Sequence, residues 1–92
     1  MTITILLLGQ ARQLAAADRI ELDLPENACV DDALPAILVG ADQRLTTVLA
    51  DEDGKLRRSV MAIVRDETID PSEAGLLNDG DELSLLPPMS GG

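Results

Sequence analysis

The sequence predicts one small α+β domain in which a helix packs against a mixed β-sheet. Three observations support this prediction. The chain has 92 residues, 46% of them apolar, which is enough for one hydrophobic core but not for two. Strand-like segments lie near both ends, at 2–8 and 82–86, and a segment with helical spacing lies between them. A helix laid across a sheet accommodates this order of elements.

The first quarter of the chain predicts an antiparallel hairpin. Residues 2–8 have the pattern of a strand, which Gly9 ends. Residues 10–17 are expected to form a loop or a short helical turn. Residues 19–24 then alternate strictly between polar and apolar side chains, as a half-buried antiparallel strand does. Two strands with a short connection indicate a pair.

A short helix is predicted from Asp31 to Gly40. Asp31 is the expected N-cap, because its carboxylate can accept a hydrogen bond from a free backbone N–H of the first turn. Pro35 has no N–H, so it should lie within that first turn, and the helix should not begin much before Asp31. Four apolar side chains at helical spacing should face the sheet, namely Ala33, Leu34, Ile37 and Leu38.

The second half of the chain predicts three further strands. Apolar residues at helical spacing recur at 45–49 before the first of them. Residues 51–54 indicate a solvated turn, since the acidic run lacks the alternating ligands and final Glu of a calcium loop. Residues 59–64 are the most strand-like segment and are expected to be central. Shorter strands are expected at 68–69 and 82–86.

These elements fit a β-grasp arrangement, in which the first and last strands pair in parallel at the centre of the sheet. Residues 1–86 would then form the domain. Residues 87–92 would leave one end of the sheet as an extended tail.

The end of the chain carries the strongest functional signal. Pro87 and Pro88 follow the last strand directly, and because neither can donate a backbone hydrogen bond they favour an extended chain. Gly91 and Gly92 have no Cβ, so they can enter a narrow slot. The six residues can reach roughly 18–20 Å beyond the sheet.

We predict that the α-carboxylate of Gly92 is the reacting group. The predicted partner-binding tail consists of Pro87, Pro88, Met89, Ser90 and Gly91. A frayed end or a remnant of processing is the alternative explanation for Gly-Gly alone.

The residue inventory argues against self-contained catalysis. There is no His, so neither a Ser-His nor a Cys-His relay can form and no imidazole can bind a metal. Cys29 is the only cysteine, which leaves no internal disulfide and no thiolate zinc cluster. It is expected to be a small buried hydrophobic residue. We predict no metal site and a chain that offers a group to an enzyme.

The charge and hydropathy exclude two classes of partner. Seventeen acidic residues against seven basic ones give a net charge of −10, which argues against nucleic acid and anionic membranes. No segment is long enough to span a membrane and no signal peptide is evident, so a soluble, cytoplasmic protein is predicted. Seven carboxylates and no basic residue follow Arg65. We expect a partner that presents Lys and Arg to the tail; a generic solubilising surface is the alternative.

Four segments, in this order and spacing, carry a resemblance to a known family. Residues 3–9 look like an opening strand and its glycine, 53–57 look like an Asp-Gly-x-Leu-Arg segment, and 78–82 look like the turn before a last strand. Residues 87–92 are similar to the Pro-Pro-x-x-Gly-Gly ending of molybdopterin synthase small subunits. From end to end, the chain resembles the MoaD/ThiS family of ubiquitin-like sulfur carriers.

The resemblance implies that another enzyme activates the C-terminal glycine. An E1-like adenylyltransferase of the MoeB/ThiF type would use ATP to form an acyl-adenylate at Gly92. Sulfur from a persulfide donor would then displace AMP and leave a thiocarboxylate. In the molybdopterin synthase of this family, the tail enters a MoaE-like large subunit and donates sulfur to the pterin precursor. The chain would be the non-catalytic subunit, with no bound cofactor, and an apolar patch near the tail would contact the partner.

Other functions remain open. The same chemistry serves thiamin, cysteine and thiolated tRNA in related carriers, although the Pro-Pro ending favours molybdopterin. A modifier joined to lysines through Gly92 and a non-reactive binding module are alternatives from other classes. Two positions depart from the family pattern: Leu8 stands where an aromatic residue is frequent, and Arg65-Asp66 stands where Asn-Gly is frequent.

Overall fold

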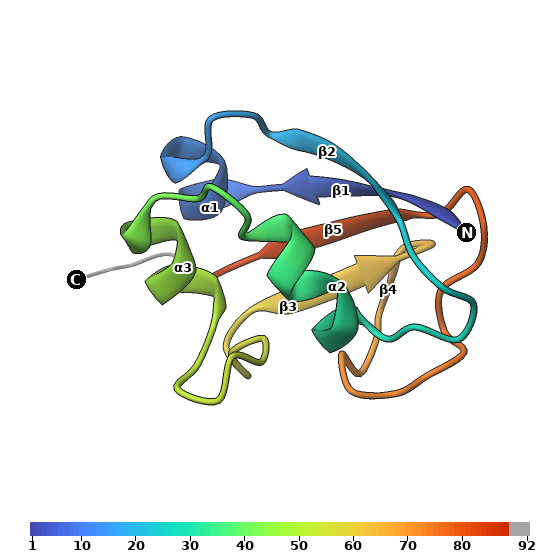
Figure 1. The fold of residues 1–92 in the computed structure, drawn as a ribbon. Coiled ribbons are helices and arrows are strands. Elements are labelled where there is room, and N and C mark those ends of the chain that lie inside the picture. The colour runs from blue at the N-terminus through green and yellow to red at the C-terminus, as the bar shows by residue number, and fades with distance from the viewer. Residues whose placement is uncertain (89–92) are drawn as a thin grey trace.

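Five strands form one mixed sheet in the computed structural model, which describes residues 1–88 (Figure 1). The strands are β1 (Thr2–Leu7), β2 (Arg19–Asp23), β3 (Met61–Val64), β4 (Glu67–Thr68) and β5 (Glu82–Leu86). Their order across the sheet is β2-β1-β5-β3-β4. The β1–β5 pair is parallel and the other pairs are antiparallel, which confirms the predicted hairpin and the predicted parallel pairing of the first and last strands.

The prediction that residues 59–64 form the central strand is wrong in position. β3 has neighbours on both sides, but the centre of the sheet belongs to β5. Both strands alternate buried and exposed positions, so their apolar patterns do not distinguish a central strand from its neighbour. What places β5 centrally is its pairing with β1, a contact between the two ends of the chain.

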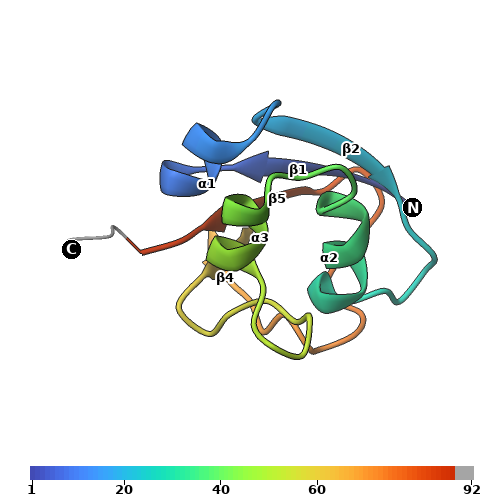
Figure 2. The same cartoon turned by 60° about the vertical axis from the view of Figure 1, so that its left-hand side comes forward.

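Three helices cover one face of the sheet, as the two views in Figures 1 and 2 show. They are α1 (Gly9–Leu14), α2 (Val30–Ile37) and α3 (Gln43–Leu49). Alternate side chains of the strands point toward these helices, and the apolar faces of the helices pack against them. The largest fully buried side chains come from both layers: Ile3, Ile5, Leu7, Leu34, Leu49, Leu83, Leu85, Val30 and Val64. Within residues 1–88, no helix has the length and hydropathy needed to cross a membrane.

The start of α2 differs from the prediction. The N-cap is Cys29, not Asp31, and the helix therefore begins one residue before the expected cap. Asp32 serves this end instead, because its Oδ2 accepts the backbone N–H of Cys29 at 3.1 Å. Pro35 lies past the first turn, so the carbonyl of Asp31 receives no helical hydrogen bond from it. The loss is limited because α2 ends at Ile37, only two residues further on.

The turn between β3 and β4 explains one departure from the family pattern. Arg65 and Asp66 have φ angles of 52° and 63°, so both lie in the left-handed region. Two consecutive left-handed residues are what a two-residue type I′ hairpin turn requires, and Asn-Gly adopts it with the least strain. Arg65-Asp66 therefore makes the same turn with less suitable residues.

Candidate functional site

The predicted tail begins where β5 ends. Leu86 is the last residue of the strand, Pro87 is buried and Pro88 is exposed. The predicted reacting group at Gly92 lies outside the described residues, as do three further residues of the predicted tail, Met89, Ser90 and Gly91. The part of the site that the structure describes is therefore the root of the tail and the surface around it.

The turn between β1 and α1 lies directly against this root. The backbone N–H of Leu8 donates to the carbonyl of Leu85 at 3.0 Å, which continues the parallel ladder past the end of β1. Gly9 follows with φ +58°. A Cβ placed on Gly9 would lie 3.2 Å from Leu86 Cδ1 and 4.0 Å from the carbonyl oxygen of Pro87. The backbone at Gly9 and the strand–tail junction are thus close neighbours.

An apolar patch lies beside the root, on the sheet face that the helices leave open. The register aligns Leu6, Ser84 and Ile63 in one row, and Leu86 with Met61 in the next row toward the tail. These side chains alternate with the buried ones on the same strands, so they point away from the helices. Met61 is 43% exposed, one of two large hydrophobic residues with high exposure among residues 1–88. We call Leu6, Met61, Ile63 and Leu86 the tail-side patch.

The other half of the open face is charged and internally paired. Arg19 forms an ion pair with Glu82 at 3.2 Å, and Arg65 forms one with Asp81. Arg65 also donates to the carbonyl of Leu76 at 2.9 Å. Burial acts to raise the pKa of Asp81, but hydrogen bonds from Arg65 and the backbone N–H of Asn78 outweigh it and lower that pKa below its usual value. These contacts join the β3–β4 turn to the segment that enters β5.

Four of the carboxylates that follow Arg65 lie at the end of the sheet opposite to the tail root. Because β5 runs parallel to β1, its first residue Glu82 lies beside Thr4, at the opposite end of the strand from the tail. Asp81 and Asp79 precede it, and the β3–β4 turn with Asp66 lies at this same end. The end that carries the tail is instead bordered by α1 and by the loop that enters β3. These two segments carry both signs of charge. Arg12 of α1 pairs with Asp18 at 3.1 Å, and the loop holds Asp51, Glu52 and Asp53 as well as Arg57 and Arg58.

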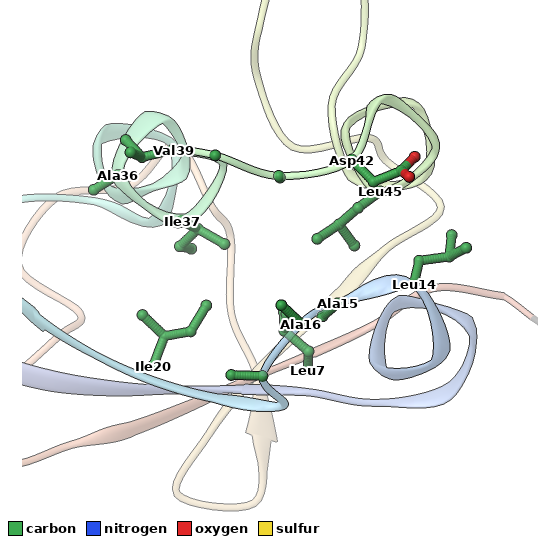
Figure 3. Close-up of a pocket in the computed structure, with 13 residues that line it drawn as sticks. Leu7, Leu14, Ala15, Ala16, Ile20, Ala36, Ile37, Val39, Asp42 and Leu45 are labelled. Atoms are coloured by element: carbon green, nitrogen blue, oxygen red, sulfur yellow. The ribbon is translucent and has the colours of Figure 1, made fainter.

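A separate apolar hollow of about 660 Å³ lies on the helix side, between the α1–β2 and α2–α3 connections (Figure 3). Leu7, Ile20, Ile37 and Leu45 point into it (Figure 3). Asp42 is its one ionisable lining residue, and the Asp42 carboxylate accepts the backbone N–H of Arg44 at 2.7 Å. None of the predicted site residues lines this hollow. Its lining offers no nucleophile and no acid–base pair.

Cys29 is buried, as predicted, with 9% of its surface exposed. Burial is the main reason that the pKa of its thiol is raised. A raised pKa disfavours the thiolate, which is the nucleophilic form of cysteine. Cys29 is therefore poorly suited to carry sulfur. Among residues 1–88, no three side chains capable of binding a metal ion come together.

The fold and the position of the tail define a class of protein. The five-stranded mixed sheet has a central parallel pair of first and last strands, helices on one face, and Pro87 and Pro88 directly after the central strand. This arrangement is a ubiquitin-like β-grasp domain. The model of the ThiS family matches residues 5–92. The chain therefore belongs to the ThiS family of ubiquitin-like sulfur carriers, in agreement with the resemblance seen in its sequence.

The chain is similar to proteins named as modifiers and to proteins named as sulfur carriers. Small archaeal modifier protein 1 from Haloferax volcanii is 35% identical over 86 residues, which cover 94% of this chain and 95% of the relative. The molybdopterin synthase sulfur carrier subunit from Chlamydomonas reinhardtii is 27% identical over the full length of both chains. The crystal structure of SAMP1 from Haloferax volcanii covers both chains completely, with a TM-score of 0.81 and 30% identity.

Proposed function

We propose that this protein carries sulfur as a thiocarboxylate on Gly92 and donates it to the molybdopterin precursor as the small subunit of molybdopterin synthase. Membership of the ThiS family carries the first part of this proposal. The Pro-Pro-x-x-Gly-Gly ending, placed directly after β5, and the resemblance to a molybdopterin synthase sulfur carrier subunit support the second.

The chemistry requires an enzyme outside this chain. A carboxylate is a poor electrophile, so an E1-like enzyme of the MoeB/ThiF type would transfer AMP from ATP to the Gly92 carboxylate and release pyrophosphate. The persulfide donor would then attack the acyl carbon, and AMP would leave. Reductive cleavage of the resulting acyl disulfide by a thiol would leave the thiocarboxylate. This chain's own contribution is to present the terminal group.

The tail-side patch supports a docking role for the open face. An apolar surface beside the tail root would let a partner bury Leu6, Met61, Ile63 and Leu86 while the tail enters its pocket. A MoaE-like large subunit and the activating enzyme would use this face in turn. With Arg12, Arg57 and Arg58 in the segments that border this end, the partner should meet it with a surface of mixed charge.

A protein modifier is the second candidate. The relative with the higher identity is named as a small archaeal modifier, and the crystal structure of SAMP1 has the same overall fold. The same acyl-adenylate or thioester can react with a lysine amine and form an isopeptide bond. The two functions therefore share the activation step and differ in the acceptor.

Intact mass spectrometry of the protein from its native cell tests the proposal. We expect an exchange of oxygen for sulfur, localised by fragmentation to Gly92. Deletion of Gly92 should abolish it without changing the unfolding midpoint, because glycine has no side chain to add to a hydrophobic core. The Cys29→Ala variant is the matched control and should retain it.

The same measurement separates the alternatives. Sulfur that is lost with Cys29→Ala would mean that the thiol, not Gly92, carries it. Covalent adducts on the lysines of other proteins, without any thiocarboxylate, would favour the modifier. An unmodified chain after incubation with ATP, the activating enzyme and a sulfur source would overturn the proposal in favour of a non-reactive binding module.

A further inference from the structure

Gly9 has an environment that other left-handed glycines of this chain lack. Five glycines of the described chain have positive φ. At Gly54 an added Cβ would meet nothing within 4 Å, and the same holds for Gly40. At Gly9 the added atom would meet Leu86 Cδ1 at 3.2 Å, closer than ordinary van der Waals contact. The absence of a side chain at position 9 therefore does more than permit a turn.

The neighbour of Gly9 is the residue at which the central strand becomes the tail. Leu86 is held on its other side by its pairing with Met61 of β3. The carbonyl of Pro87 is also near, 4.0 Å from the site of the missing Cβ. A side chain at position 9 would press on Leu86 from the β1–α1 turn. Leu86 Cδ1 would then have to give by a few tenths of an ångström, either by a shift of the side chain within the tail-side patch or by a shift of the junction.

We propose that Gly9 is a positioning residue for the tail. By lacking a side chain, it leaves the space in which Leu86 lies, and it lets the β1–α1 turn close against the strand–tail junction. The direction in which the chain leaves β5 is thereby fixed relative to the tail-side patch. The consequence for activity rests on the proposed function, whereas the structural consequence does not.

The Gly9→Ala variant tests this proposal, with Gly54→Ala as its matched control. Both substitutions place alanine in a left-handed conformation, so each should lower the melting temperature by about 4–8 °C. Only Gly9→Ala should disturb the hydrogen bond from the Leu8 N–H to the Leu85 carbonyl. We expect amide hydrogen exchange at Leu8 to become about tenfold faster in Gly9→Ala than in Gly54→Ala. Equal exchange at Leu8 in the two variants would overturn the proposal, whatever the protein's activity.

Steady-state adenylation by the E1-like enzyme gives the second measurement. If the tail is misdirected while the patch still docks, kcat should fall about tenfold or more and KM for the carrier should change less than about threefold. Gly54→Ala should change neither. A rise in KM with constant kcat would assign Gly9 to docking and refute a positioning role.

A double variant isolates the contact itself. In a Leu86→Ala background the Cδ1 atom is absent, so Gly9→Ala should cause no further loss of kcat. A further loss of the same size in that background would show that the Gly9–Leu86 contact is not responsible. If the wild-type chain is not adenylated at all, the proposed function fails, and the Leu8 exchange still decides the role of Gly9.

Discussion

Asp31 and Asp32, two adjacent carboxylates at the start of α2, accept hydrogen bonds from different parts of the fold. Asp32 accepts the backbone N–H of Cys29, and this hydrogen bond is the main reason that its pKa is lowered. Asp31 instead reaches across the fold, where its Oδ1 accepts the N–H of Leu56 at 2.9 Å, while its own N–H donates to the carbonyl of Pro71 at 3.0 Å. Asp31 therefore joins α2 to two loops that are distant in sequence.

Replacing Asp31 should show the value of this acceptor. Asp31→Ala leaves the N–H of the buried Leu56 without its partner and should lower the free energy of unfolding by about 1–3 kcal/mol. Asp31→Asn keeps an oxygen at the same position and should lose about 1 kcal/mol or less. Urea denaturation measures both. Equal losses would mean that the negative charge, not the acceptor, is what matters.

At the scale of elements, the β3–β4 hairpin is tied to the turn that precedes β5. Arg65 pairs with Asp81, and Asp81 also accepts the N–H of Asn78 at 2.7 Å. Because the pKa of Asp81 is lowered in the folded protein, folding favours its ionised form. Its contribution to stability is complete above the ordinary aspartate pKa of about 3.9 and is lost as the pH falls through the lower, folded value.

We therefore expect a pH-dependent difference between the wild type and Asp81→Asn. The melting temperature of the wild type should fall as the pH drops below about 4, and that of Asp81→Asn should fall less steeply. Thermal unfolding followed by circular dichroism from pH 7 to 2 measures the two slopes. Parallel curves would show that the Arg65–Asp81 pair adds nothing to the pH dependence. Asp32, Asp42 and Asp70, whose pKa values are also lowered, remain in both proteins.

Local sequence patterns predicted which segments form helices and strands better than they predicted which segments contact one another. The strands at 2–8 and 19–24 were predicted from their apolar patterns, and the order of the elements suggested the parallel pairing of the ends. The cap of α2 was missed, because nothing in the sequence separates an Asp that caps from an Asp that reaches Leu56. Gly9 was recognised as a strand end, but its contact with Leu86 joins positions far apart in the chain and has no local signal.

At the scale of the whole molecule, charge is distributed by topology and not by order in the sequence. The carboxylates after Arg65 are near the tail along the chain, yet β5 carries the tail away from Asp79, Asp81 and Glu82. The expectation of a partner that presents Lys and Arg to the tail therefore cannot rest on these three carboxylates. Like charges that are close in the sequence form one charged surface only if the strand directions bring them to the same end of the sheet.

The net charge of −10 should make stability depend on salt. Mutual repulsion opposes the compact state and is screened by salt. Raising NaCl from about 0.01 to 0.5 M, over which screening lengths fall severalfold, should raise the melting temperature by about 4–8 °C, equivalent to about 1 kcal/mol. A neutral co-solute at equal osmolality should have a smaller effect. An unchanged melting temperature in salt would mean that the surface ion pairs offset the repulsion.

The place of β5 in the sheet also governs the order in which this protein can be made. β1 and β3, its two neighbours, have both been synthesised before β5, yet neither can complete its pairing until residues 82–86 arrive. Until then, much of the apolar surface of the helices is uncovered. The contacts between β1 and β5 span almost the whole chain, and contacts of such long sequence separation slow folding. In a chain that lacks residues 82–86, no strand joins β1 to β3, so we expect the sheet to remain in two parts, β2-β1 and β3-β4. The tail and the finished domain become available together, so an activating enzyme that requires the folded body would pass over incomplete chains.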